Sequence, residues 1–304
     1  MIKPKLFSVV EDNRHPLELD AALPARVREI LDRTPIFEKY PELRNILAKI
    51  PIDFFAATVH PGYNTRNSPL FFSVVVVEIL LILYDDALEG SHAENSDELK
   101  DALLGKSKPK QVFSPFYDPF AFLGQAWINI PIKTKERLIG YIFDYSNAIG
   151  EETDLLAKKH HPGVTEFLNW RKKSSGGLLG PYLSQLISGV FLEEIPNKVQ
   201  DLFDCYNFIV IYQNDYVSFR NKRDEGKLNL VFALKMDLNV QPNDALDVIM
   251  TLHNTSVKRF IQLKKEIEEE NANDGELKKF LECLYDSIIG ATRYHERFAR
   301  FATE

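Results

Sequence analysis

The sequence predicts an all-α protein, and three observations support that fold class. Apolar residues recur at spacings of three and four along almost the whole chain, as they do on the buried face of a helix. Alternating apolar and polar residues bounded by turn residues, the pattern of strands, are hard to find. The composition, with 45% hydrophobic and 27% charged residues in 304, is that of a globular protein. We therefore expect helices almost throughout and nearly no sheet.

Helix starts and breaks locate each element in order. Proline in the first turn and a capping Asn or Ser mark starts at residues 67–69, 195–196 and 241–243. Pro-Gly and Ser-Gly stretches at residues 160–163 and 174–177 interrupt the periodicity. The predicted helices span residues 23–33, 41–48, 68–88, 96–104, 119–129, 133–158, 165–173, 181–190, 196–222, 243–271 and 275–301.

The chain is expected to form one domain over residues 1–304, with residues 1–60 as a helical lead-in. No internal repeat and no linker long enough to divide domains is evident. Cys205 and Cys283 lie far apart without a CxxC spacing, which favours a reducing compartment over a disulfide framework or a zinc site. No apolar segment of a signal peptide follows the first residues, so we expect a cytoplasmic location.

The most apolar run and the overall charge exclude two classes of partner. Residues 70–84 are fewer than the roughly 20 that span a membrane, contain Glu78, and end in an acidic pair, so this run predicts a buried helix. A formal charge of -7 argues against nucleic acid, which selects a basic face. An acidic protein that binds a polyanion needs metal ions as intermediaries.

Three carboxylates end the buried helix predicted over residues 68–88. Asp85 and Glu89 are four residues apart and share a helical face with like charge, and Asp86 lies between them. The helix dipole also disfavours anions at a C-terminus, so the arrangement favours a bound cation. Magnesium suits such oxygen ligands, because it uses one or two carboxylates together with substrate phosphates and water. The alternative is a solvated acidic helix end.

A second polar face lies in the helix predicted over residues 196–222. Asn214, Ser218 and position 222 recur at four-residue spacing and therefore share one face. An amide oxygen and a hydroxyl one turn apart can bind a hard cation together with phosphate oxygens. By itself this segment could also be an ordinary polar stripe.

Taken together, the two segments resemble the paired metal-binding motifs of class I terpene synthases, most closely the microbial sesquiterpene cyclases that include trichodiene synthase. In that family a DDxx(D/E) motif and a downstream NDxxSxxxE motif face each other across an α-helical cavity and hold magnesium on a substrate diphosphate. The matching residues are Asp85, Asp86 and Glu89 in the first motif and Asn214, Asp215 and Ser218 in the second. The resemblance implies a single-domain helical bundle around a central cavity.

Two further positions agree with the family in kind and order. Arg171, just before the predicted break at residues 174–177, resembles the family's diphosphate-sensing arginine. Arg293 and Tyr294 in the last helix resemble its C-terminal Arg-Tyr pair. The resemblance implies that all three bind diphosphate oxygens, and a guanidinium suits this role because it stays charged and offers forked donors. As alternatives, Arg171 is a surface helix cation and Arg293 is one of several basic residues near the C-terminus.

Lys222 departs from the family pattern, because it stands where the second motif ends in a carboxylate. Glu225 lies seven residues beyond Ser218, a rise of about 10 Å, and does not simply replace that ligand. Three outcomes remain open: a distorted helix brings Asp224 or Glu225 to the metal, Lys222 contacts diphosphate directly as a point charge, or the site has decayed. We expect the second.

The resemblance implies a magnesium-dependent cyclase that ionises an isoprenyl diphosphate and cyclises the carbocation to a sesquiterpene. We expect farnesyl diphosphate to be the preferred substrate. Monoterpene or diterpene cyclisation on the same motifs is the alternative, as is a catalytically silent isoprenoid-binding homologue signalled by Lys222. A chain-elongating prenyltransferase fits less well, because the chain has no second DDxxD. No nucleic acid and no membrane span are expected, and the protein is a monomer or a homodimer.

Aromatic faces can steady a carbocation, and the sequence offers 21 Phe, 12 Tyr and 2 Trp. The candidates in or near the expected cavity helices are Phe54, Phe55, Phe71, Phe72, Trp127, Phe208, Tyr212 and Tyr216. His60, His160 and His161 each lie at a Pro-Gly turn, and we interpret them as turn residues rather than catalytic groups.

Overall fold

The computed structural model describes residues 18–34, 36–66, 68–88, 103–104, 117–221 and 228–297, with only the backbone at 86–88, 117–119 and 297. Within these ranges the chain is helical and holds no strand, which confirms the all-α class. The helices in chain order are α1 (Leu23–Asp32), α2 (Ile36–Lys39), α3 (Leu43–Lys49), α4 (Ile52–Val59), α5 (Phe71–Leu88), α7 (Tyr117–Ala126), α8 (Ile132–Ala157), α9 (Val164–Ser174), α10 (Leu179–Ser188), α11 (Asn197–Arg220), α12 (Leu230–Leu238), α13 (Pro242–Glu270) and α14 (Gly275–Arg297).

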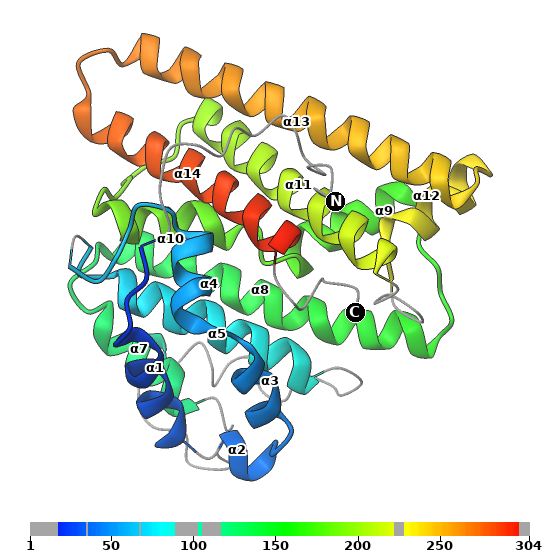
Figure 1. Ribbon diagram of the computed structural model, residues 1–304. Helices are drawn as coiled ribbons and strands as arrows, with labels where there is room; N and C mark the ends of the chain where they lie inside the picture. The colour runs from blue at the N-terminus through cyan, green and yellow to red at the C-terminus, as the bar shows by residue number, and fades with distance from the viewer. Residues whose placement is uncertain are drawn as a thin grey trace, which may run out of the picture.

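The long helices pack side by side as a bundle (Figure 1). Helices α13 and α14 form an antiparallel hairpin, and α11 packs along α13 and also contacts α14. Helix α14 lies against α4 and α10, while α10 in turn contacts α5 and α8. The short helices α1, α2 and α3 lie together at one end, where α3 packs on α5. Two central helices, α5 and α11, therefore have neighbours on several sides.

Helix α5 is apolar around most of its circumference, as expected of a central helix. The β-branched run Val74 to Val77 is fully buried, although such residues have modest helix propensity. Burial decides the conformation here, because each fully buried side chain of this size contributes roughly 1.5–3 kcal/mol. Near its C-terminal end, the Tyr84 hydroxyl shares a hydrogen bond of 2.5 Å with Ser146 Oγ on α8. This bond fixes the helix just before the acidic segment.

Helix α11 is tied to the α13–α14 hairpin by a buried polar chain. The Gln213 amide donates to Thr292 Oγ1 at 2.9 Å and to His253 Nε2 at 3.1 Å. His253 Nδ1 then donates to Asn254 Oδ1 at 3.1 Å. Burial lowers the pKa of His253, so its ring is neutral as this donor pattern requires. The chain of bonds sets the rotation of α11 and therefore which of its side chains face inward.

Sequence periodicity predicted most of these elements closely. In the described ranges, the observed helices begin and end within three residues of the expected bounds. Three helices were missed: α2, α4 and α12. Of the helix predicted over 96–104 only residues 103–104 are described, and the last residues of the 275–301 prediction also lie outside the described part.

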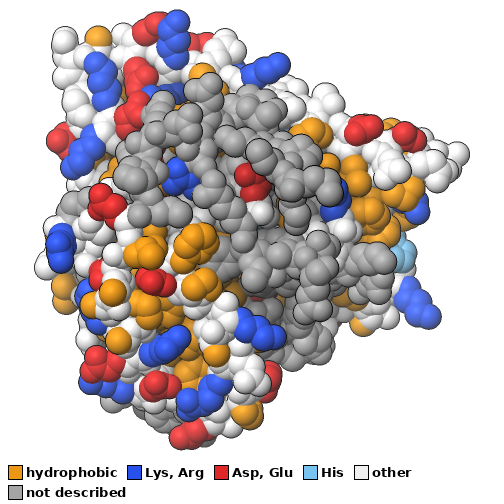
Figure 2. All heavy atoms as spheres, in the orientation of Figure 1, with side chains coloured by type: hydrophobic (Ala, Val, Ile, Leu, Met, Phe, Trp, Pro, Cys, Tyr) orange, Lys and Arg blue, Asp and Glu red, His pale blue; other side chains and the backbone are white. Residues whose placement is uncertain are grey.

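The surface and the apolar helices of the structure relate to the expectation that the protein has no membrane span and binds no nucleic acid. No helix in the described ranges is long and apolar enough to cross a membrane. On the face shown in Figure 2, basic and acidic side chains are interspersed over the described surface. Exposed large apolar side chains occur on separate elements, for example Ile128 before α8 and Met236 in α12.

Candidate active site

A cavity of about 450 Å³ opens between the central helices, within the usual size range of ligand pockets. Its walls come from α4, α5, α8, the junction of α9 and α10, α11 and α14. Many of the side chains that line it are apolar, including Leu81, Ile82 and Leu183. The polar side chains predicted from the motifs lie along part of this lining.

The first acidic motif reaches the cavity through Asp85. This residue lies in the last turn of α5 and lines the cavity. The side chain of Asp86 and the whole of Glu89 lie outside the described residues, so their predicted roles stay untested.

The second motif lines the same cavity from α11. Asn214 and Ser218, one helical turn apart, are both lining residues, and the Ser218 side chain is buried. Asp85 of the first motif and Asn214 and Ser218 of the second therefore line one cavity from two helices. Lys222 lies outside the described residues, together with Asp224 and Glu225, and the three alternatives for this position remain open.

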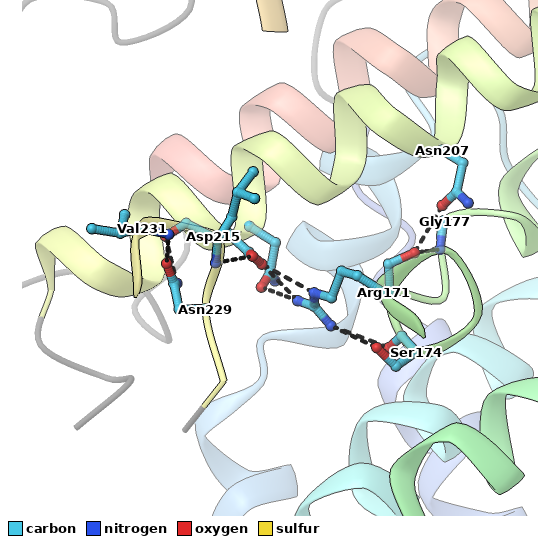
Figure 3. Close-up of polar contacts among 10 residues, drawn as sticks. Arg171, Ser174, Gly177, Asn207, Asp215, Asn229 and Val231 are labelled. Carbon is cyan, nitrogen blue, oxygen red and sulfur yellow. Dashed lines mark hydrogen bonds and ion pairs between the residues drawn. The ribbon is translucent and has the colours of Figure 1, made fainter. Parts of the chain in front are cut away.

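Arg171 lies at the centre of a polar network that joins α9 to α11 (Figure 3). Its Nη2 donates to Asn214 Oδ1 at 2.8 Å and to Asp215 Oδ1 at 2.9 Å, and its Nε donates to the same carboxylate oxygen at 3.1 Å. Its Nη1 reaches Ser174 O and Oγ, each at 3.3 Å. Hydrogen bonds with an ionised donor or acceptor are about twice as strong as neutral ones. Arg171 thus lines the cavity with its guanidinium held in one orientation.

Asp215 performs a role that the motif alone did not indicate. Its Oδ2 accepts from the Leu230 amide at 3.0 Å, and its main-chain carbonyl accepts from Asn229 Nδ2 at 2.9 Å. Asn229 Oδ1 in turn caps α12 by accepting from Val231 N at 2.8 Å. One carboxylate therefore joins Arg171, which also donates to Asn214, to the start of α12. The acidic residue next to Asn214 was the only sequence signal for this contact.

The break between α9 and α10 forms another part of the wall. Residues 174–177 all line the cavity, and Gly176 adopts a positive φ of 69°. A Cβ on Gly177 would lie 2.4 Å from Asn207 Oδ1 on α11. That same oxygen accepts from Ser175 Oγ at 2.8 Å, while Asn207 Nδ2 donates to Lys172 O at 3.0 Å. Glycine at position 177 leaves room for the Asn207 side chain, which would have to shift if a Cβ were added.

The two residues of the C-terminal Arg-Tyr pair differ in their position relative to the cavity. Tyr294 lines the cavity, with its ring edge-on to Phe55 at 5.6 Å between centroids. Arg293 is buried beside it on α14 and is not one of the lining residues. The next residue, His295, lines the cavity and donates from Nδ1 to Ala291 O at 2.8 Å. Burial lowers the pKa of His295 to about 4, and the charge of Arg171 acts in the same direction.

Of the aromatic candidates from the sequence, Phe55 lines the cavity and the other seven are not among its lining residues. Among the residues that the structure describes, the other lining aromatics are Tyr145, Tyr206 and Tyr294. Position along a helix could not separate these from ordinary core aromatics, because helices contact neighbours on several faces at once.

The donor chemistry fits a hard divalent cation. Asp85 offers a carboxylate, Asn214 an amide oxygen with a second lone pair beyond its bond to Arg171, and Ser218 a hydroxyl. All are oxygen donors, the kind that magnesium prefers, and magnesium keeps several waters and needs few protein ligands. Within the described residues there is no group of three or more His, Cys, Asp or Glu side chains that could hold a metal ion.

Comparison with known proteins agrees with this geometry. The sequence model described as "Terpene synthase family 2, C-terminal metal binding" matches residues 79–259, more than half of the chain. The chain belongs to this terpene synthase family. The matched segment contains Asp85, Arg171, Asn214 and Ser218. The class I terpene synthase assignment is therefore confirmed, whereas the closer resemblance to trichodiene synthase stays a prediction.

Solved terpene synthases share the fold. Linalool/nerolidol synthase from Streptomyces clavuligerus is 16% identical, with 92% of this chain and 98% of that chain covered and a TM-score of 0.75. The 2-methylisoborneol synthase from Streptomyces coelicolor A3(2), solved with Mg²⁺ and 2-fluoroneryl diphosphate, is 13% identical over 97% and 98%, with a TM-score of 0.73. An α-eudesmol synthase is 17% identical over 94% and 98%, with a TM-score of 0.74. A search of curated proteins finds no match.

Proposed function

We propose that the protein is a magnesium-dependent terpene cyclase that ionises an isoprenyl diphosphate and cyclises the carbocation to a sesquiterpene. The proposed preferred substrate is farnesyl diphosphate. One observation carries the proposal: Asp85 on α5 and the Asn214–Ser218 face of α11 line one cavity whose other walls are largely apolar. Polar oxygen donors suit the ionic end of such a substrate, and the apolar walls suit its hydrocarbon chain. Membership of the terpene synthase family supports the same reaction class.

The polar end of the cavity would bind the diphosphate. Asp85, Asn214 and Ser218 would hold magnesium, with Asp86 and Glu89 completing the first motif. When bound, magnesium supplies positive charge that neutralises the leaving diphosphate. The methylisoborneol synthase of similar fold was solved in complex with Mg²⁺ and 2-fluoroneryl diphosphate, which supports this pairing of metal and substrate.

The protein's own donors would stabilise the departing diphosphate. Arg171 is fixed by Asp215 and Asn214, so its charge is in position before the substrate binds. Tyr294 lines the cavity and would donate its hydroxyl to the diphosphate. Arg293, which the resemblance predicts as a second cationic contact, is buried beside it on α14 outside the lining and would reach the diphosphate only after a change of side-chain conformation. Lys222 would contact the diphosphate directly in place of the missing carboxylate.

The apolar walls would protect the carbocation from water. Leu81, Ile82 and Leu183 exclude solvent by occupying the lining with hydrocarbon. The rings of Phe55, Tyr145 and Tyr206 offer faces or edges to the same space. An aromatic face attracts a cation through its quadrupole, by about 2 kcal/mol or more when desolvated.

Incubation with geranyl, farnesyl and geranylgeranyl diphosphates tests the function. Diphosphate release is followed with and without Mg²⁺, and the extracts are analysed for hydrocarbons and alcohols by gas chromatography and mass spectrometry. We expect magnesium-dependent release with farnesyl diphosphate as the best substrate and cyclic sesquiterpenes as products. Faster turnover of the C10 or C20 substrate would assign a mono- or diterpene cyclase instead.

A catalytically silent isoprenoid-binding homologue is the second candidate, because Lys222 replaces the last acidic position of the second motif. Absence of diphosphate release from all three substrates, in a folded protein, would favour this alternative over the cyclase.

A further inference from the structure

A carboxylate lines the cavity well away from the motif residues. Glu78 on α5 is a lining residue whose side chain is 16% exposed. Both of its oxygens lie 2.9 Å from Nε2 of His60, whose side chain is only 4% exposed. Because an ionised carboxylate only accepts, His60 donates from Nε2. The histidine that the sequence suggested as a turn residue therefore forms an ion pair or strong hydrogen bond with a cavity group.

The position of Glu78 relative to Asp85 follows from helix geometry. Glu78 precedes Asp85 by seven residues, which is nearly two full turns, so the two side chains share a face about 10 Å apart along the axis. Leu81 and Ile82 line the cavity in the interval. The cavity-facing side of α5 therefore carries the carboxylates of Glu78 and Asp85, with the apolar side chains of Leu81 and Ile82 between them.

Close packing builds the surroundings of Glu78. Tyr206 on α11 also lines the cavity, burial raises its pKa, and the charge of Glu78 raises that pKa further. A Cβ on Gly180 would lie 2.4 Å from the Tyr206 ring, so glycine at that position makes room for the tyrosine. At Gly290 of α14 a Cβ would lie 1.8 Å from Val59 O. This close approach of α14 fixes the end of α4, and His60 is the next residue.

A purely structural role accounts poorly for this pair. A buried ion pair is weak evidence for stability, since hydrophobic residues of similar volume often serve as well. Glu78 is not fully buried, and it faces the cavity that would hold the hydrocarbon chain. A negative charge at that place attracts positive charge that has moved along the hydrocarbon chain of the substrate.

We propose that Glu78 accepts the proton that ends the carbocation cascade, with His60 as its positioning residue. This inference rests on the proposed cyclase function. The C–H bond next to the cationic carbon breaks, its electron pair becomes the new C=C π bond, and the proton moves to a carboxylate oxygen of Glu78. Once the olefin leaves, the carboxylic acid returns that proton to water. Donation from His60 Nε2 to both oxygens holds the carboxylate of Glu78 in one orientation beside the cavity.

Glu78→Gln tests the assignment, because glutamine keeps the size of the side chain and removes the charge. Ionisation occurs at the other end of the cavity, so diphosphate release with the best substrate should stay within about threefold of wild type. The yield of the principal olefin per diphosphate released should fall about tenfold or more, since a general base contributes at least ~100-fold. Glu151→Gln, an exposed carboxylate on α8, is the matched control and should change neither quantity.

The results with Glu78→Gln and with wild type distinguish a failure of the Glu78 assignment from a failure of the proposed cyclase function. An unchanged olefin yield per diphosphate in Glu78→Gln refutes the role of Glu78, as does a wild-type product mixture without olefins. A slower release of diphosphate with unchanged product ratios also refutes it. If the wild type releases no diphosphate, both the cyclase function and this inference fail. Circular dichroism checks folding, and if Glu78→Gln is unfolded, His60→Gln should shift the product ratio in the same direction while diphosphate release is kept.

Discussion

The contact between Arg171 and Asp215 gives the sharpest test of how the site is built. The carboxylate is only 2% exposed and accepts three bonds, two from Arg171 and one from the Leu230 amide. Removing one partner of a buried pair typically costs 3–5 kcal/mol. Because Arg171 is 15% exposed, we expect the lower end, about 3 kcal/mol, for Asp215→Asn. The loss arises mainly from the guanidinium left without its counter-ion.

A double-mutant cycle measures this coupling directly. The free energies of unfolding of wild type, Asp215→Asn, Arg171→Met and the double variant are obtained from urea titrations followed by circular dichroism. The double variant should lose less than the sum of the single losses, by about 2 kcal/mol. As a control, the exposed pair Lys265–Glu269, 75% and 66% exposed, should couple by only about 0.3–0.5 kcal/mol. Additivity within about 0.5 kcal/mol at Arg171 and Asp215 would refute the structural argument.

Three further predictions concern single positions. Lys222→Glu should change the magnesium concentration that supports half-maximal diphosphate release; an unchanged rate and metal requirement would put Lys222 outside the site. Gly177→Ala should lower the free energy of unfolding in urea by about 1–3 kcal/mol, because the new Cβ would lie 2.4 Å from Asn207 Oδ1; an unchanged value would contradict that close packing. In the folded protein the pKa of His295 is lowered from 6.5 to about 4, so between these pH values the histidine is protonated in the unfolded chain and neutral in the folded one. The free energy of unfolding should therefore fall by about 3 kcal/mol as the pH drops from 6.5 to 4. Urea titrations across this range should show a shallower acid loss in His295→Gln, and equal slopes would contradict the prediction.

The fold was predictable where the local pattern and the tertiary environment agree. Helix α13 carries a proline in its first turn, a capping box at Gln241 and a regular apolar face, and its bounds were found to within one residue. Helices α4 and α12 were missed, because eight or nine mostly apolar residues carry too little periodicity to separate a short helix from a loop. The cap that begins α12 depends on Asn229, whose side chain is itself positioned by α11.

The candidate site was predictable to the extent that it repeats along one helix. Asp85, Asn214 and Ser218 were selected by spacing, and the structure brings all three to one cavity. Glu78 was interpreted only as a charge that argues against a membrane span, since its contact joins α5 to His60, which follows α4 and lies 18 residues earlier in the chain. Such pairs depend on how helices meet and leave no periodic signal in the sequence.

We expect the two motifs together to bind diphosphate with magnesium. Isothermal titration calorimetry with inorganic diphosphate, at fixed Mg²⁺ and without it, measures this binding. We expect measurable binding to wild type only with Mg²⁺, and a loss of about tenfold or more in Asp85→Ala and in Asn214→Ala, equivalent to the ~1.4 kcal/mol of one weakened ligand contact. Glu151→Gln should bind as wild type does. Equal affinity without Mg²⁺, or wild-type affinity in both motif variants, would show that the two motifs do not bind magnesium and diphosphate together.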